Sequence, residues 1–265
     1  MKKVESLWNL RGNLGGANFY KKDGKNLIRE KGGVDGERIK NAPEFKRIRD
    51  NNQEFGVAMS AAHKFRKGVI QMVKLFGDNS FASKLGTKLL KMVKAGLGNW
   101  GERTLEVVNQ GAAIIGVEFN KMDSFTGKFA APFTFTPAIA RNEVTLDIPV
   151  FDPRLLLTPP PAAQYFRMTT AVYALTDFSW DANEKLYKPV NPDLLEVHGY
   201  ASSAELPLNA VTAQPITLTA SLTGLPPVPA TAGLVAMIGI EFFVQINGSY
   251  FRLESGNAMM IANVF

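Results

Sequence analysis

The character of this chain changes near residue 131, and the change limits what the chain can fold into. Only Pro43 precedes Pro132, whereas the other 14 of the 15 prolines follow. Up to Glu106 there are 22 Lys/Arg against 11 Asp/Glu, and from Val107 onward there are 8 against 13. A chain polarised in this way can attract copies of itself, or an anionic polymer, through its basic end. We therefore expect a basic front followed by a slightly acidic, β-rich body.

Composition excludes several classes of site. The chain has 265 residues and an apolar fraction of 46%, which is enough to bury a core without disulfides. It contains no cysteine, which removes thiolate chemistry and cysteine-based metal sites. The two histidines, His63 and His198, are too few for a histidine-rich metal site. We expect no metal and no cofactor.

The hydrophobic segments predict neither export nor membrane insertion. The charged start, residues 1–3, is followed by Glu5 and Arg11 where a signal peptide would have an apolar stretch. The longest apolar run, Leu234–Val244, contains Glu241 and is too short to span a bilayer. We expect a soluble protein in the cytoplasm or in an assembled particle.

Residues 1–40 are predicted to form an arm with a β-hairpin. Two short extended runs flank Asp23-Gly24, a pair that favours the type I′ turn of a hairpin. The glycine-rich segment Gly12–Gly16 lacks the spacing of a phosphate-binding loop and is interpreted as flexible. The hairpin either folds onto its own body or adds a strand to another subunit. The side chains expected to mediate assembly are Phe19, Tyr20, Leu27 and Ile28.

Residues 41–128 are predicted to be a basic helical region. Gly56 and Gly68 are expected to bend or divide the first helix, and Gly77–Ser80 to end it. Its apolar stripe is predicted at Phe45, Ile48, Phe55, Met59, Ala62, Val69, Val73 and Phe76. The apolar face of the next helix is predicted at Phe81, Leu85, Leu89, Met92 and Val93. A third short helix is expected over residues 103–113.

Residues 129–265 are predicted to form an antiparallel β-sandwich or a jelly-roll-like body, which makes the whole chain α+β. Turn-rich or proline-rich links without long helices separate the candidate strands, and Asn247-Gly248 predicts a second tight turn. The candidate strands are Ala131–Thr136, Glu143–Phe151, Phe166–Phe178, Glu196–Ala204, Ile216–Leu222, Ala236–Ile246, Tyr250–Glu254 and Met259–Phe265.

Lysines at helical spacing form the sharpest candidate binding surface. Cations on one exposed helix face could neutralise phosphates and give strongly salt-dependent binding, but the same pattern describes an ordinary solvated face. The candidate phosphate contacts are Lys64, Lys67, Lys74, Lys84, Lys88, Lys91 and Lys94.

No group of residues predicts catalysis. Asp147 and Asp152 lie close in sequence, but nearby prolines indicate a strand end, where Asp usually serves a turn. The oxygen-rich segment 177–184 departs from calcium-loop spacing and is interpreted as a turn. Both histidines are interpreted as structural. We expect no enzyme and assign no catalytic, cofactor-binding or metal-binding residue.

One resemblance is carried by short motifs in the front of the chain. These are the Gly-Asn-x-x-Gly opening at Gly12, the Phe19–Lys25 segment, Ile28-Arg29 and the helix from Phe45 to Phe55. Together they resemble the front of a family of small uncharacterised bacterial proteins, over roughly residues 12–60. The resemblance implies no activity and no site residues.

The leading hypothesis is a non-enzymatic structural protein that self-assembles into a shell, sheath or filament through its arm and its β-body. Coat-like proteins of viruses often have a basic front and a jelly-roll body, which is an analogy of layout. One alternative is a nucleic-acid-binding protein that uses the lysine face. Another is a sandwich that binds carbohydrate or a surface ligand through Trp180, Tyr187 and Tyr200.

Overall fold

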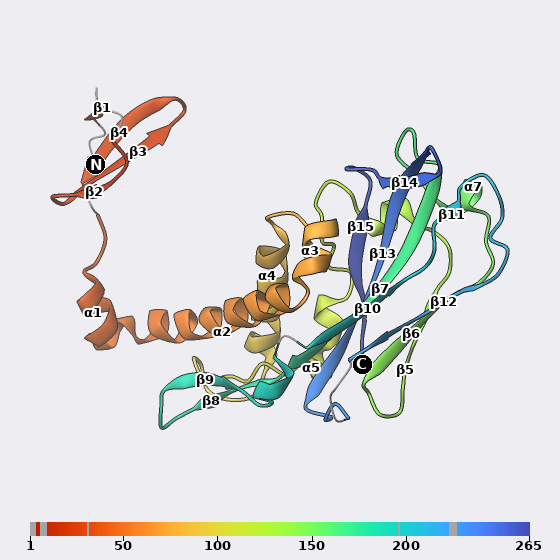
Figure 1. Cartoon of the computed structure of the whole chain (residues 1–265). Coiled ribbons are helices and arrows are strands. Elements are labelled where there is room, and N and C mark those ends of the chain that lie inside the picture. Colours follow the sequence, from red (N-terminus) through yellow and green to blue (C-terminus); the bar gives the residue numbers. More distant parts are fainter. Residues whose placement is uncertain (1–3, 6–9, 31, 196, 223–226) are drawn as a thin grey trace. The chain divides into compact units, whose positions relative to one another are not determined.

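The chain folds into two units, Met1–Arg49 and Asp50–Phe265. It contains both helices and antiparallel strand pairs, so its fold class is α+β. The computed structural model describes residues 4–5, 10–30, 32–195, 197–222 and 227–265 (Figure 1). Residues 1–3, and Glu196 at the start of one predicted strand, lie outside this description. No helix within the described ranges combines the length and the apolar character needed to cross a membrane.

Two tight turns organise the first unit. Asp23 and Gly24 have φ values of 51° and 79° and join two paired strands, which confirms the predicted hairpin. Gly15 and Gly16 adopt the same left-handed conformation, with φ values of 55° and 82°. This glycine pair closes a second hairpin, so the glycine-rich segment contains a strand and a turn, and its flexibility stays a prediction. The sheet has the order β1-β4-β3-β2, with β1 at Val4–Glu5, β2 at Gly12–Leu14, β3 at Ala17–Lys22 and β4 at Lys25–Glu30.

Short helices complete the first unit. They are α1 (Gly36–Asn41) and the 3-10 turn η1 (Pro43–Phe45), where proline suits a first-turn position because it has no N–H to satisfy. The Arg49 guanidinium donates to the carbonyl oxygens of Ile39 and Ala42, each at 2.8 Å. Arg49 thereby adds a donor to carbonyl groups at the end of α1, where helical N–H partners run out.

The helices of the second unit follow the predicted order. Helix α2 (Lys46–Gly68) runs without a break through Gly56 and ends at Gly68, where a division was also predicted. Helices α3 (Ile70–Phe76) and α4 (Phe81–Ala95) follow. All five residues predicted for the apolar face of α4 are buried. The stripe predicted for α2 is wrong in part, because Phe55 is 52% exposed and Ile48 is also exposed. The residues that α2 buries are Glu54, Val57, Ala58, Ala61, Ala62, Phe65 and Gly68.

Two sheets and one hairpin form the β part of the second unit. The six-stranded sheet has the path β10 (His198–Ser202), β7 (Tyr165–Thr176), β13 (Ala232–Ile246) and β14 (Ser249–Arg252), with β11 (Leu206–Pro207) on β7 and β15 (Ala258–Val264) on β13. The three-stranded sheet is β12 (Ile216–Ser221), β6 (Glu143–Ile148) and β5 (Thr134–Pro137). The hairpin pairs β8 (Phe178–Asp181) with β9 (Leu186–Pro189).

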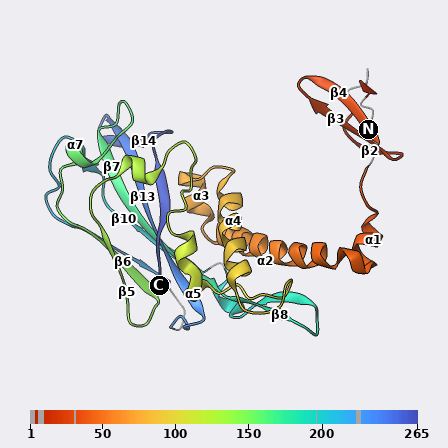
Figure 2. The same ribbon diagram turned by 180° about the vertical axis from the view of Figure 1, so that it is seen from behind.

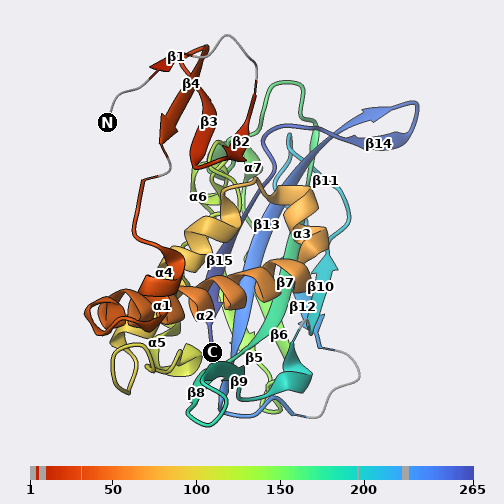
Figure 3. The same cartoon turned by 90° about the vertical axis from the view of Figure 1, so that its left-hand side faces the viewer.

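The central strands β7 and β13 are buried on both faces, which is why they are almost continuously apolar in sequence. On one face Tyr173 and Met237 pack in the same cluster as Phe65 of α2. On the other face Met168 and Ile240 share a cluster with residues of β6 and β12. Helices therefore cover one face of the six-stranded sheet and the smaller sheet covers the opposite face (Figures 1 and 2). Viewed from the helical side, α2 crosses in front of β13 and β7 (Figure 3).

Shorter elements connect these layers. The helix expected over 103–113 is reduced to α5 (Val107–Gln110) and the 3-10 turn η2 (Gly111–Ile114). The remaining short elements are α6 (Phe125–Lys128), α7 (Pro153–Leu156) and η3 (Pro192–Leu194). Each of the eight predicted strands has an observed counterpart, with ends that differ by a few residues. The three-part division at residues 40 and 128 stays a prediction, although α2, α3 and α4 share one core with the sheet.

Candidate functional site: a cationic sheet, a lysine face and an aromatic pocket

The predicted assembly residues lie in register on two neighbouring strands of the first unit. Phe19 on β3 is opposite Ile28 on β4, and Tyr20 is opposite Leu27. Because successive side chains of a strand point to opposite faces, each face of the sheet carries one of these apolar pairs. All four side chains are half-buried, and the Arg29 guanidinium lies 5.4 Å from the centre of the Tyr20 ring.

This unit has no buried residue within its described part, residues 10–30 and 32–49. Small sheets are marginally stable without a packed apolar face. It also holds most of the positive charge: residues 1–49 contain 13 Lys/Arg against 6 Asp/Glu, and residues 50–265 contain 17 against 18. The first unit is therefore a cationic sheet whose apolar side chains on β3 and β4 are only half-buried.

The structure divides the seven candidate lysines among three helices. Lys64 and Lys67 lie on α2, Lys74 lies on α3, and the other four lie on α4. On α4, the lysines alternate with the buried residues and form one face, of which Lys88, Lys91 and Lys94 are exposed and Lys84 is half-buried. We call Lys84, Lys88, Lys91 and Lys94 the α4 lysine face.

The charges of the α4 lysine face are not neutralised by direct pairing. None of its four lysines has an ion pair within 4 Å among the described residues. Asp78 is the carboxylate that interacts with Lys84, and burial of Asp78 is outweighed by hydrogen bonds from Ser80 and Lys121, so that its pKa is lowered. A shallow hollow of about 350 Å³ lies beside Lys84, Lys88 and Lys121.

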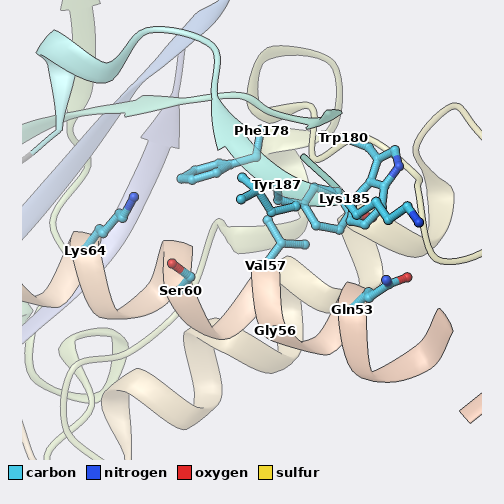
Figure 4. Close-up of a pocket in the computed structure, with 10 residues that line it drawn as sticks. Gln53, Gly56, Val57, Ser60, Lys64, Phe178, Trp180, Lys185 and Tyr187 are labelled. Atoms are coloured by element: carbon cyan, nitrogen blue, oxygen red, sulfur yellow. The ribbon is translucent and has the colours of Figure 1, made fainter. Parts of the chain in front are cut away.

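A separate pocket of about 310 Å³ lies between helix α2 and the β8–β9 hairpin (Figure 4). Helix α2 contributes residues at helical spacing, and the hairpin contributes aromatic side chains that lie above the helix. The Trp180 and Tyr187 rings meet edge to face, with centroids 5.1 Å apart and an interplanar angle of 68°. The lining residues are Gln53, Gly56, Val57, Ser60, Lys64, Phe178, Trp180, Lys185, Leu186 and Tyr187.

A buried ion pair fixes the wall of this pocket. Glu54 of α2 is 1% exposed and accepts hydrogen bonds from the Arg103 guanidinium at 2.7 and 2.6 Å and from the Gly101 N–H at 2.8 Å. The Tyr187 hydroxyl lies 3.0 Å from the carbonyl oxygens of Gly101 and Arg103, to which it can donate. The helix, the loop containing Gly101 and the hairpin are thus joined by one hydrogen-bond network.

The ionisation of this network follows from its contacts. Burial raises the pKa of Glu54, but the hydrogen bonds from Arg103 and Gly101 outweigh it and leave that pKa below the usual value. The Glu54 carboxylate raises the pKa of Arg103. Burial, followed by the charge of Glu54, raises the pKa of Tyr187. The network therefore contains an ionised pair and a neutral phenol at neutral pH.

The structure brings together two of the three aromatic residues proposed for ligand binding. Trp180 and Tyr187 line the same pocket, whereas Tyr200 is exposed on β10 in a different hollow, beside His198 and Thr219. Sequence reasoning missed the contribution of α2, in particular Gly56 and Ser60. Their helical spacing from Lys64 was a usable signal, but nothing in the sequence pairs this helix face with the hairpin.

The residues weighed for catalysis do not converge. Asp152 caps α7 and pairs with Arg154, whose hydrogen bond lowers the pKa of Asp152. Asp147 accepts a hydrogen bond from Thr217 at 2.6 Å. Asp181 accepts from two backbone N–H groups of its own turn, as expected for a turn residue. Across the described ranges, no group of three or more His, Asp or Glu could hold a metal ion.

No family model and no curated protein matches this chain. The resemblance of residues 12–60 to a family of small bacterial proteins stays a prediction.

Proposed function

We propose that this chain is a non-enzymatic structural subunit that self-assembles, and that its first sheet makes the contact between subunits. One observation carries the proposal: the unit that contains this sheet has no buried residue in its described part. Phe19 with Ile28, and Tyr20 with Leu27, place apolar surface on both faces. Covering these pairs would provide the burial that the unit lacks by itself.

A second copy of the chain is the partner we infer. Self-association requires no other molecule, and a contact between two different surfaces of identical subunits generates rings or filaments. The net charge of the first unit is positive and that of the second is close to neutral, so a head-to-tail contact avoids the repulsion between two cationic sheets. The shell, sheath or filament is then built from the body of each subunit and the sheet of its neighbour.

The body in this proposal is a β-sandwich-like structure with helices on its outer face. Clusters of buried residues from β6 and β12 with residues from β7 and β13 support this interpretation. A further support is the approach of β10 to β12, where a Cβ on Gly199 would lie only 2.0 Å from the Ser221 carbonyl oxygen. The absence of a side chain at Gly199 lets the two sheets meet at this edge.

Sedimentation velocity of the full chain over a range of concentrations tests the proposal. We expect oligomers for the unmodified protein, and we expect the double variant F19S/I28S to shift strongly toward monomer. The matched control is K21S/N26S, which changes the next cross-strand pair on the same face and should leave assembly intact. A monomeric unmodified protein at high concentration and low salt would contradict the proposal. So would the same degree of oligomerisation in the two double variants.

The α4 lysine face supports nucleic-acid binding as a second candidate function. Its four lysines have no ion pair to any residue that the structure describes, so they are free to contact phosphates. Fluorescence anisotropy with duplex and single-stranded DNA should show binding that falls steeply as salt increases. Replacing Lys84, Lys88 and Lys91 by Gln should flatten this dependence, and no binding at low salt would exclude the idea.

A further inference from the structure

We propose that the pocket between α2 and the β8–β9 hairpin binds a small anion with a flat, apolar body, such as an aromatic carboxylate or a nucleotide. This inference concerns the second unit only and does not depend on self-assembly. The volume of about 310 Å³ lies at the lower end of the range for small-molecule sites. Apolar and aromatic side chains with a few polar groups are also typical of such sites.

The flat, apolar body of the ligand follows from the aromatic wall. Trp180 and Tyr187 are half-buried, so their rings are partly accessible from the pocket. Their edge-to-face contact and the hydrogen bonds of the Tyr187 hydroxyl hold both rings in place. A rigid aromatic surface binds a flat molecule at little cost in side-chain entropy.

The negative charge follows from the two lysines of the pocket. Lys64 and Lys185 lie toward opposite ends of the aromatic wall (Figure 4). Neither has an ion pair to a described residue, and Lys64 instead lies 5.2 Å from the centre of the Phe178 ring. The nearby carboxylates of Asp181 and Glu184 are both paired with Lys188, at 2.8 and 2.5 Å. The pocket thus has positive charge that an anionic ligand would neutralise.

At two positions of this pocket, the residue type is unfavourable for the backbone conformation that it adopts. Gly56 lies inside helix α2, where glycine is unfavourable, and a Cβ there would meet no atom within 4 Å. Packing therefore does not require this glycine, but its missing side chain keeps the helix side of the pocket open. Lys185 has a φ of 53°, in the left-handed region that favours glycine. Local choices that conflict with the fold are expected where a protein keeps a functional site.

The test uses the full chain and follows the Trp180 indole N–H by NMR, with its resonance assigned by comparison with W180F. The probes are 2-naphthoate with its neutral isostere 2-naphthamide, and AMP with adenosine. Each anion should shift the Trp180 resonance and bind about two- to fivefold more tightly than its neutral partner at low salt, as expected for an ion pair with a solvent-accessible lysine. The two pairs distinguish a carboxylate ligand from a phosphate ligand.

Matched lysine variants separate a built site from general attraction to a basic protein. The double variant K64Q/K185Q should remove the preference for the anion, whereas K74Q/K91Q should retain it, because Lys74 and Lys91 are exposed lysines outside the pocket. Equal affinities for anion and neutral isostere would overturn the proposal, as would equal effects of the two double variants. A Trp180 response to the neutral sugar cellobiose, without a response to either anion, would assign the pocket to carbohydrate and also overturn it.

Discussion

The two units of this protein obtain their structure in different ways. The first unit has paired strands and two left-handed turns but no buried residue in its described part. The second unit has strands that are buried on both faces and clusters of fully buried aromatic side chains. Turn chemistry can therefore specify strand register without a core, whereas stability must come from burial. Equivalent substitutions in the two units should therefore lower stability by very different amounts.

The largest expected difference concerns phenylalanine. Phe65 is fully buried, with its ring centre 4.7 Å from that of Tyr173. We expect F65A to lower the free energy of unfolding by about 3–5 kcal/mol, as for other buried phenylalanines. The same substitution at the half-buried Phe19 should lower the free energy of unfolding by less than about 1 kcal/mol. Urea denaturation measures the first value, and similar losses for F65A and F19A would remove the contrast.

The next largest expected effect concerns the contribution of the buried Glu54 carboxylate to the stability of the second unit. E54Q should lower the stability at neutral pH by about 2–3 kcal/mol, because the largely buried Arg103 would lose its charged partner. The pKa of Glu54 is lower in the folded protein than in the unfolded chain. Its contribution is therefore complete above the unfolded-state pKa and is lost as the pH falls through the folded-state pKa.

Thermal unfolding between neutral and acidic pH measures this contribution. E54Q should have a flatter acid dependence than the unmodified protein. The control E102Q changes an exposed glutamate near the same network and should alter stability by less than about 0.5 kcal/mol. An acid dependence unchanged by E54Q would show that the ion pair does not contribute as proposed.

A smaller effect tests the turn that sets the register of the first unit. G24A places a Cβ at a φ of 79° and should destabilise the hairpin by about 1–2 kcal/mol. Amide hydrogen exchange should accelerate on β3 and β4 and remain unchanged on β7 and β13. The control G36A lies at the start of α1, where φ is not positive, and should not accelerate exchange on β3 or β4. Unchanged exchange in G24A would mean that this turn does not specify the sheet.

The same contrast explains how much of the fold the sequence predicts. Asp23-Gly24, the break at Gly68 and the apolar face of α4 are local signals, and the structure confirms each of them. The turn at Gly15-Gly16 was not predicted, because glycine-rich composition alone does not distinguish a tight turn from an irregular loop. Local rules therefore describe the first unit well once its turns are recognised.

Non-local contacts were harder to predict. The stripe assigned to α2 counted large apolar side chains and so included Phe55, which is exposed. The helix instead buries several alanines and Glu54. The ion-pair partner of Glu54 is Arg103, which lies in a loop distant in the sequence. The aromatic pocket was not predictable for the same reason, since α2 and the hairpin meet only through the tertiary fold.

The smallest predicted effect concerns the glycine that local rules disfavour. G56A should raise the free energy of unfolding by about 0.5–1 kcal/mol, because alanine is the better helix former and its Cβ meets no atom within 4 Å. The same methyl group would narrow the pocket and should weaken the response of Trp180 to 2-naphthoate. A G56A variant that is more stable and binds less well would identify Gly56 as a residue kept for the pocket at a cost in helix stability. If G56A is more stable and binds equally well, the glycine is not required for binding, and only the lysines and the aromatic wall remain as support for a ligand site.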